Sequence, residues 1–228
     1  MRVVVNAAMS ADGKLSTRER KQIEISGPED FERVDRLRAE SDAVMVGVGT
    51  VVADDPSLTV DDSDLRSERE ARGDPANPAR VVADSRIRTP PNARVLDDSA
   101  ASYLLVSEAA PGDFVTQMRE NGATVIPAGE DRVDLGSAFA ELEAEGIEQL
   151  MVEGGGELIF SLFESDLVDE LSVFVGPTLI GGRDAPTLAD GDGFVDEFPE
   201  LALESVDRLD EGVLLQYEVG EKLSGSGR

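Results

Sequence analysis

The stretch 151-MVEGGGELIFSLF-163 carries the clearest fold signal in the sequence. An apolar run meets three consecutive glycines, and apolar residues then recur at the spacing of a helix. Exposed amides and the positive end of the dipole at such a helix start favour an anion; a tight turn without a ligand is the alternative. The stretch predicts a strand–helix unit whose loop suits a phosphate.

Two carboxylates flank this loop, although carboxylates repel phosphates. Glu157 falls in the first turn of the predicted helix, where an acid is favourable even without a ligand. Glu153 ends a strand of buried character, so its carboxylate needs a partner such as a sugar hydroxyl or an amino group. We therefore expect Glu153 to face a substrate.

Apolar strands alternate with amphipathic helices along the rest of the chain. The strand candidates are 2-RVVVNAA, 43-AVMVGVG, 80-RVVADS, 102-SYLLVS, 123-ATVIPA, 148-EQLMVEG, 171-LSVFVGP and 213-VLLQYEV. The helix candidates are 28-PEDFERVDRLRAE, 112-GDFVTQMREN, 135-LGSAFAELEAEG and 156-GELIFSLFES. This order predicts an α/β fold with a mainly parallel sheet, helices on both faces and an antiparallel C-terminal hairpin.

The organisation along the chain predicts one domain over residues 1–220. The segment 61–79 is charged and rich in turn formers, which indicates an exposed acidic loop, and 221–228 is expected to be a flexible tail. No apolar run approaches the roughly 20 residues of a membrane span. We expect a soluble, cytoplasmic protein.

Acidic residues dominate the charge. The 228 residues include 48 acidic and 21 basic ones, a formal net charge of -27. Such a surface repels nucleic acid and anionic membranes, so neither is an expected partner. Because this much self-repulsion requires salt screening, we hypothesise a halophilic host with a high-salt cytoplasm.

The chain contains neither cysteine nor histidine. Disulfides, thiolate metal sites and the usual near-neutral general base are therefore excluded, and with them Ser-His-Asp and Cys-His catalysis. We expect no metal site. Any proton relay must use a carboxylate, Lys14 or water.

Three further strand ends carry polar residues. In 43-AVMVGVGTVVADDPSLTV-60, two glycines precede Thr50, which suits a ligand or an ordinary turn that relieves crowding. In 82-VADSRIRTPPNARV-95, Arg86 and Arg88 suit the 2′-phosphate of NADP, or alternatively pair with surface acids. In 6-NAAMSADGK-14, the residues alone favour a simple Asp-Gly bend.

Six motifs in chain order resemble one enzyme family. They are N-x-x-M-S-x-D-G-K at 6–14, the segment 26-SGPED, the run 41–60, N-P-x-R-V-V-x-D-S at 77–85, E-G-G-G at 153–156 and G-G-x-x-A-P-T at 181–187. Together they resemble the archaeal 2,5-diamino-6-ribosylamino-4(3H)-pyrimidinone 5′-phosphate reductases of riboflavin biosynthesis, which are similar to the C-terminal reductase domain of bacterial riboflavin deaminase-reductases. The resemblance covers about residues 2–219.

The resemblance implies a dihydrofolate-reductase-like fold, a homodimer, and NADPH, in some members NADH, as hydride donor. The implied oxidoreductase opens the ribosyl ring to an imine at C1′ and reduces that carbon, which gives the ribitylamino form. A protonated imine is cationic, so a nearby carboxylate would stabilise it. Glu153 is the first catalytic candidate and Asp12 the second.

Site residues follow from positions that match the family's motifs. The expected cofactor-binding residues are Met9, Thr50, Asp54, Ser85, Arg86, Ile87, Arg88, Val133, Gly154, Gly155, Gly156 and Glu157. The expected substrate-binding residues are Arg38, Leu58 and Glu153. Bacterial relatives tend to carry lysine near Asn6 and arginine near Asp61, so the substrate's 5′-phosphate must bind Arg38 or another basic residue here.

Other functions stay open on the sequence alone. The same reduction could act on the deaminated substrate, 5-amino-6-(ribosylamino)uracil 5′-phosphate. A dihydrofolate reductase on the same architecture would need a pterin pocket richer in aromatic residues, which make up 4% of this chain. A non-catalytic nucleotide-binding module would use the same glycine loops without turnover.

Overall fold

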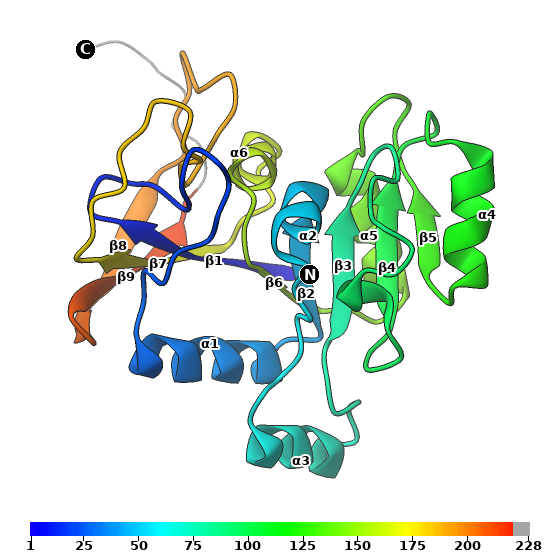
Figure 1. The fold of residues 1–228 in the computed structure, drawn as a ribbon, viewed down its shortest axis with the longest axis horizontal. Coiled ribbons are helices and arrows are strands. Elements are labelled where there is room, and N and C mark those ends of the chain that lie inside the picture. The colour runs from blue at the N-terminus through cyan, green and yellow to red at the C-terminus, as the bar shows by residue number, and fades with distance from the viewer. Residues whose placement is uncertain (221–228) are drawn as a thin grey trace. The chain divides into compact units, whose positions relative to one another are not determined.

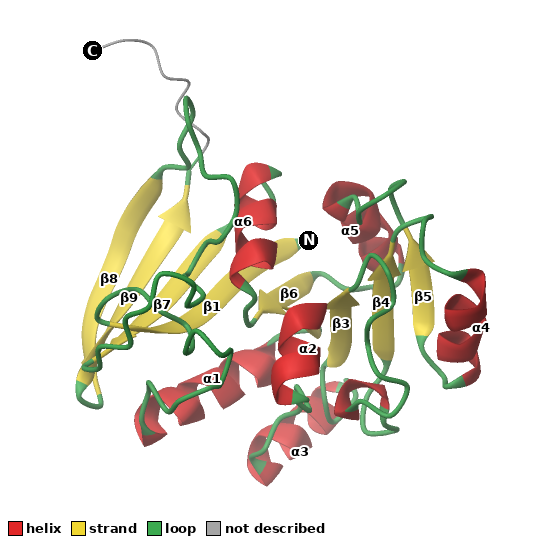
Figure 2. Ribbon diagram, turned by 45° about the horizontal axis from the view of Figure 1, so that its top comes forward, coloured by secondary structure: helices red, strands yellow, loops and turns green. Residues whose placement is uncertain are grey.

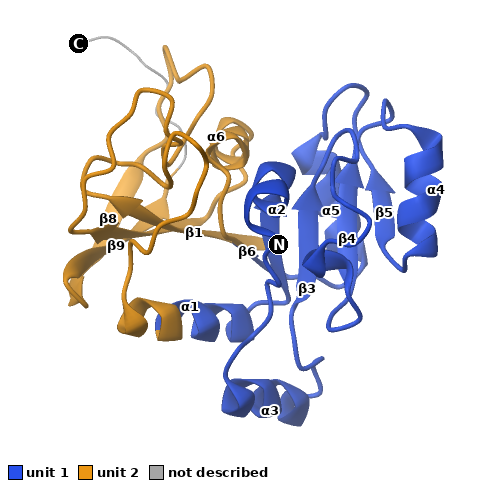
Figure 3. Ribbon diagram, viewed as in Figure 1, with its two compact units in different colours: residues 1, 33–151 blue, residues 2–32, 152–228 orange. Residues whose placement is uncertain are grey.

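The structure is a computed structural model that describes residues 1–220, so the tail predicted at 221–228 lies outside the described residues. The chain forms two compact units, coloured separately in Figure 3. The first unit comprises Met1 and residues 33–151, and the second comprises residues 2–32 together with residues from 152 onward. The prediction of one domain stays a prediction.

The first unit is an α/β layer built on parallel strands (Figure 1). Its strands are β2 (Ala43–Gly47), β3 (Ala79–Ala83), β4 (Ser102–Val106), β5 (Thr124–Pro127) and β6 (Gln149–Val152), in the order β5-β4-β3-β2-β6. The pairs β2–β3, β3–β4 and β4–β5 are all parallel. Its helices are α2 (Val48–Asp54), α3 (Ser63–Arg72), α4 (Gly112–Glu120), α5 (Leu135–Ala144) and the 3-10 turn η1 (Arg94–Leu96).

The core of the first unit explains why these strands are apolar on both sides. Val44, Val46, Val82 and Leu104 are buried to 1% exposure or less and join one hydrophobic cluster with residues of the surrounding loops and helices. A strand that is covered on both faces buries its side chains at successive positions. Those positions are therefore apolar, as predicted for these segments.

The second unit combines one parallel pair with an antiparallel hairpin (Figure 2). The strands are β1 (Arg2–Ser10), β7 (Glu170–Gly176), β8 (Leu201–Leu209) and β9 (Gly212–Val219), with α6 (Gly156–Glu164) beside them. β1 pairs parallel with β7, β7 antiparallel with β9, and β9 antiparallel with β8. Helix α1 (Pro28–Glu40) has residues in both units.

The predicted fold class is confirmed: the protein is α/β, with mostly parallel strands and an antiparallel C-terminal hairpin. Within residues 1–220 no helix is both long and apolar enough to cross a membrane.

The prediction of an exposed loop over 61–79 is wrong, because α3 occupies most of that segment. The Asp62 side chain accepts hydrogen bonds from two amides of the first turn, and Gly73 ends the helix in the left-handed conformation. Arg69 is 3% exposed and donates from Nη1 to the carbonyls of Ala39 and Ser41 at 2.7 and 2.8 Å. Helix α3 is stabilised by its caps and by the buried Arg69 guanidinium. It lacks the apolar stripe by which amphipathic helices are recognised in sequences.

Two more elements were not predicted. Helix α2 begins immediately after β2, with Gly47 as its N-cap, so the expected strand–turn at 47–50 is a strand–helix junction. Strand β8 has the sequence LALESVDRL, which mixes apolar and charged residues. Eight of its residues pair with residues of β9. Strand β8 is therefore defined by its pairing with β9, which the periodicity of its own sequence does not reveal.

Candidate active site

Helix α2 carries two of the predicted cofactor-binding residues in the first unit. Thr50 lies in its first turn and Asp54 at its last residue, and both side chains are half-buried. Burial raises the pKa of the Asp54 carboxyl above its ordinary value, so Asp54 retains a proton to higher pH than an exposed aspartate.

The turn after β3 is fixed by Asp84, a fully buried carboxylate that is not among the predicted site residues. Its Oδ1 accepts from the Arg88 amide at 2.9 Å, and its Oδ2 accepts from the amide and the hydroxyl of Thr89, both at 2.7 Å. Within this turn Ile87 is buried and adopts φ 54, a conformation that a β-branched residue rarely takes. A strained turn held by a buried carboxylate is typical of a ligand-binding segment.

Ser85 and Val133, predicted separately as cofactor-binding, lie together. The Val133 amide donates to Ser85 Oγ at 3.1 Å, and Ser107 Oγ donates to the Ser85 carbonyl at 2.8 Å. The structure thus joins the turn after β3 to the segment that precedes α5, two segments that are 48 positions apart in the sequence.

The two arginines of this turn have different surroundings. Arg86 is exposed, donates to the Ala109 carbonyl and pairs with Asp131, each at 3.3 Å. Arg86 thus has a surface acid as a partner, and its role at the cofactor stays a prediction. Arg88 is also exposed, and among the described residues its guanidinium has no hydrogen-bond or ion-pair partner. Arg88 is the cation left available to an anionic ligand.

Arg38 and Leu58, the predicted substrate-side residues of the first unit, also lie close together. Arg38 Nη1 donates at 3.0 Å to the carbonyl of Thr59, the residue after Leu58. Leu58 is 2% exposed and has φ 54, so a bulky side chain is held in the left-handed region. Asp61 sits nearby with its amide bound to the Asp35 carboxylate at 2.8 Å.

The glycine loop lies in the second unit, between β6 and α6. Gly154 and Gly155 adopt φ 131 and φ 94, which side-chain-bearing residues rarely reach, and no side chain caps the helix. Glu153 is half-buried directly before the loop, whereas Glu157 is exposed in the first turn of α6. Within residues 1–220, no side-chain hydrogen bond caps the backbone amides at this helix start.

Of the remaining predicted residues, Met9 lies on β1 opposite Val175 of β7, and Asp12 lies in the turn after β1. The Asp12 carboxylate accepts from Ser10 Oγ at 2.7 Å and from the amides of Ile180 and Gly181 at 3.0 and 2.8 Å. These hydrogen bonds lower the pKa of Asp12 to about 2, with the Ser10 hydroxyl as the largest cause. Proton donation by Asp12 near neutral pH finds no support in this geometry.

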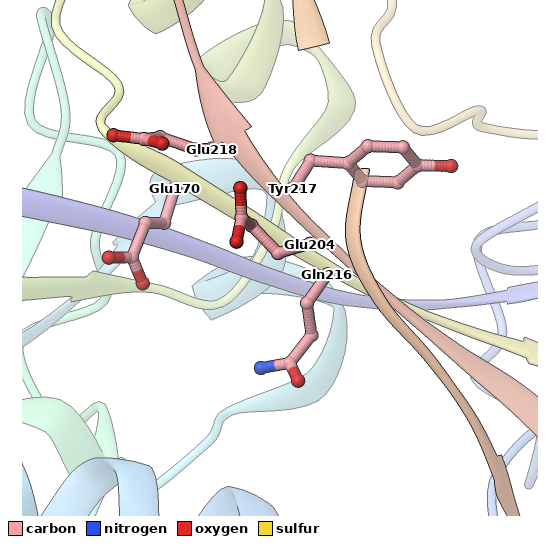
Figure 4. A pocket seen from close by; sticks show the side chains of 5 residues that line it. All are labelled: Glu170, Glu204, Gln216, Tyr217 and Glu218. Atoms are coloured by element: carbon pink, nitrogen blue, oxygen red, sulfur yellow. The ribbon is translucent and has the colours of Figure 1, made fainter. Parts of the chain in front are cut away.

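A pocket of about 250 Å³ on β7, β8 and β9 of the second unit contains none of the predicted site residues (Figure 4). Three of the five residues that line it are glutamates: Glu170, Glu204 and Glu218. So many carboxylates disfavour a phosphate-bearing ligand. Among residues 1–220, no three acidic side chains are arranged as the ligands of a metal ion.

A comparison with protein families gives a match to the RibD C-terminal domain over residues 1–215. The matched residues include the motifs of both units. The chain belongs to the RibD C-terminal domain family. That match spans every predicted site residue, from Met9 to Glu157.

Two reductases are similar to this chain over nearly their whole length. The chain is 49% identical over 210 residues to the 2,5-diamino-6-ribosylamino-4(3H)-pyrimidinone 5′-phosphate reductase of Archaeoglobus fulgidus, covering 92% of this chain and 94% of that protein. It is 47% identical over 220 residues to the protein of the same name from Methanothermobacter thermautotrophicus, covering 95% and 97%. A solved pyrimidine reductase-like protein from Corynebacterium diphtheriae shares the fold at TM-score 0.82 and 18% identity, covering 96% of this chain and 92% of that one.

Proposed function

We propose that the protein reduces the ribosylamino side chain of 2,5-diamino-6-(ribosylamino)pyrimidin-4(3H)-one 5′-phosphate to the ribitylamino form, with NADPH as hydride donor. The observation that carries the proposal is the 49% identity, across 94% of its length, to an archaeal reductase named for this substrate. Riboflavin biosynthesis in the cytoplasm is the corresponding role.

Arg88 supports the choice of NADPH over NADH, and Ser85 lies in the same cofactor-binding segment of the proposal. Both arginines of the turn after β3 are exposed, and the Arg88 guanidinium has no partner among the described residues. A 2′-phosphate would give this guanidinium a charge-assisted partner in a chain whose net charge is otherwise strongly negative. Arg86, Ile87 and Val133 complete this segment in the proposal, and Thr50 and Asp54 bind the dinucleotide from α2.

The glycine loop is proposed to bind the cofactor's pyrophosphate through its backbone amides. Gly154, Gly155 and Gly156 carry no side chains that would stand between the backbone and a ligand, and the start of α6 adds the positive end of a helix dipole. Glu157 is exposed and can point away from an anion, which explains how an acid is tolerated in this turn. Met9 of β1 is proposed to contact the nicotinamide.

Glu153 is proposed to stabilise the cationic imine that forms at C1′ of the open-chain sugar. Hydride from the nicotinamide supplies the reduction, and the protein contributes orientation and charge. Arg38, held beside Leu58, is proposed to bind the substrate's 5′-phosphate. If a proton donor is needed, the raised pKa of Asp54 favours that carboxyl over Asp12.

A homodimer is proposed from the apolar face of β8 and β9. Leu201, Leu203, Val206 and Val213 have exposed fractions of 38–57%. In register, Leu203 lies opposite Tyr217 and Val206 opposite Leu215, so these side chains form one continuous apolar face of the hairpin. A second copy of the chain would bury this face, whereas a highly charged partner would not.

The experiment that tests the proposed activity follows the loss of reduced-nicotinamide absorbance with NADPH or NADH and each candidate substrate. We expect turnover with the diamino-pyrimidinone and a preference for NADPH. Turnover only with the uracil form would identify the deaminated substrate, and turnover only with dihydrofolate would identify a dihydrofolate reductase. Dinucleotide binding without any turnover would identify a binding module.

A further inference from the structure

The motif G-G-x-x-A-P-T at 181–187 belongs to a segment that has no role in the proposed activity. It lies in residues 177–190, here called the strap, which follow β7 and form neither a helix nor a named strand. In Figure 1 the strap is the yellow loop beside the blue loop that follows β1. Both ends of the strap are bound to predicted site segments of the second unit.

The first end of the strap is bound to the turn after β1. Asp12 accepts from the amides of Ile180 and Gly181, and Lys14 Nζ donates to the Ala185 carbonyl at 3.1 Å. Farther along, the Leu15 amide donates to the Pro186 carbonyl at 2.9 Å. Side-chain and backbone hydrogen bonds together fix the course of the strap.

The second end of the strap lies against the glycine loop. The Asp190 amide donates to the Gly156 carbonyl at 3.0 Å, while the Asp190 carboxylate accepts from the amide and the hydroxyl of Thr187. A Cβ atom added at Gly156 would overlap the Thr187 carbonyl and lie 2.6 Å from Asp190 Oδ2. The strap therefore packs directly against the backbone of the loop.

We propose that the strap positions the glycine loop for the phosphate-bearing ligand, and that Asp190 is the positioning residue. The loop needs such support because Gly154 and Gly155 are conformationally permissive and no side chain caps α6. Amides that bind a phosphate are effective only when held in place before the ligand arrives. The ligand's identity rests on the proposed function, but the bracing of the loop does not.

The test compares Asp190→Ala, Asp190→Asn and the matched control Asp192→Ala, an exposed aspartate two residues away. Hydrogen–deuterium exchange of peptides spanning 153–160 reports loop order, and titration calorimetry with NADPH reports binding. We expect Asp190→Ala to accelerate exchange and to raise the Kd and KM for NADPH about tenfold, while kcat stays within about twofold. Asp190→Asn keeps one acceptor oxygen and should recover most of the binding; Asp192→Ala should match the wild type.

Wild-type exchange in Asp190→Ala would overturn the proposal, as would faster exchange with an unchanged Kd for NADPH. If Asp190→Ala does not fold, Asp190→Asn decides by the same two measurements, with a smaller expected shift in the same direction. A wild-type protein that neither binds nor oxidises NADPH would overturn the proposed function, and the exchange data alone would then decide whether the strap braces the loop.

Discussion

Aspartate side chains in this protein repeatedly accept hydrogen bonds from backbone amides of a distant segment. Asp35 binds the amides of Asp61 and Asp62, Asp42 binds those of Glu148 and Gln149, and Asp210 binds those of Glu29 and Asp30. A carboxylate that satisfies two amides joins two segments without a cation. Part of the large acidic content therefore stabilises loops and helix ends.

Glu153→Gln should lower kcat by about 100-fold while NADPH still binds, because the amide cannot offset the charge of a protonated imine. Steady-state kinetics and calorimetric titration with NADPH measure the two effects. Glu148→Gln, which removes an exposed charge five residues away, should leave kcat within about twofold. Unchanged turnover in Glu153→Gln would falsify the catalytic role.

Asp97→Asn should flatten the acid dependence of stability. The Ser99 side chain and then Arg80 lower the pKa of Asp97 to about 2, below the ordinary value of 3.8. Stability from this depressed pKa is fully present above pH 3.8 and is lost as the pH falls towards 2. Urea unfolding between neutral pH and pH 2 should show a less stable variant at neutral pH that loses less on acidification.

The Asp97 carboxylate pairs with the fully buried guanidinium of Arg80. Arg80 Nη1 donates to Asp97 Oδ1 at 2.8 Å and to the Arg94 carbonyl at 2.9 Å, which holds the segment after η1. The control is Asp98→Asn, which removes one negative charge from the adjacent residue. An identical pH profile in the two variants would contradict the role given to Asp97.

At the scale of elements, α1 shows what sequence patterns predict well. Its predicted bounds, 28–40, agree with Pro28–Glu40, because proline begins the helix and acids occupy its first turn. Helix α3 escaped prediction because its buried Arg69 binds the carbonyls of Ala39 and Ser41, about 30 residues earlier in the sequence. Strand β8 escaped prediction because its pairing with β9, and not an alternating pattern of its own, defines it. The same reason applies to the site: Ser85 meets Val133 and Arg38 meets the segment at Leu58 only in three dimensions.

Asp12 marks where the site prediction has the least structural support. Its position in the motif is compatible with catalysis, but nothing local in the sequence shows that Ile180 and Gly181 supply amides to both of its oxygens. Residue type and spacing thus identify a polar turn, whereas the partners of that turn depend on the path of the chain after β7.

Arg69→Ala should destabilise α3 and the whole fold by about 3 kcal/mol, because it leaves buried carbonyl groups without donors. The Arg69 side chain binds the carbonyls of Ala39, Ser41 and Pro75. Glu68→Ala changes an exposed neighbour on the same helix and should stay within about 0.5 kcal/mol of wild type. Urea denaturation measures both, and equal effects would contradict a specific role of the guanidinium.

At the scale of the whole molecule, a net charge of -27 opposes compaction at low ionic strength. The melting temperature should rise steeply as KCl increases from low to molar concentration, since salt screens the repulsion between carboxylates. Sorbitol at matched osmolality is the control, because it does not screen charge. A melting temperature independent of KCl would reject the high-salt hypothesis.

Leu203→Glu should convert the proposed dimer to a monomer by placing a charge in the centre of the apolar face of β8 and β9. Leu203 is 55% exposed, so the substitution costs the monomer little packing. Light scattering after gel filtration gives the mass, and Glu204→Gln on the same strand is the control. A wild-type protein that is already monomeric would contradict the dimer.

Chemical labelling of the lysine that binds the strap, Lys14, can report whether the strap is attached. The sequence contains three lysines, Lys14, Lys21 and Lys222, and the structure describes the first two. Lys21 is exposed and pairs with Glu19 at 3.6 Å, whereas Lys14 donates to the Ala185 carbonyl. An amine-specific acylating reagent should therefore react with Lys21 quickly and with Lys14 only when the strap detaches. The ratio of the two labelling rates, read by mass spectrometry, would time that detachment in the native protein without any mutation.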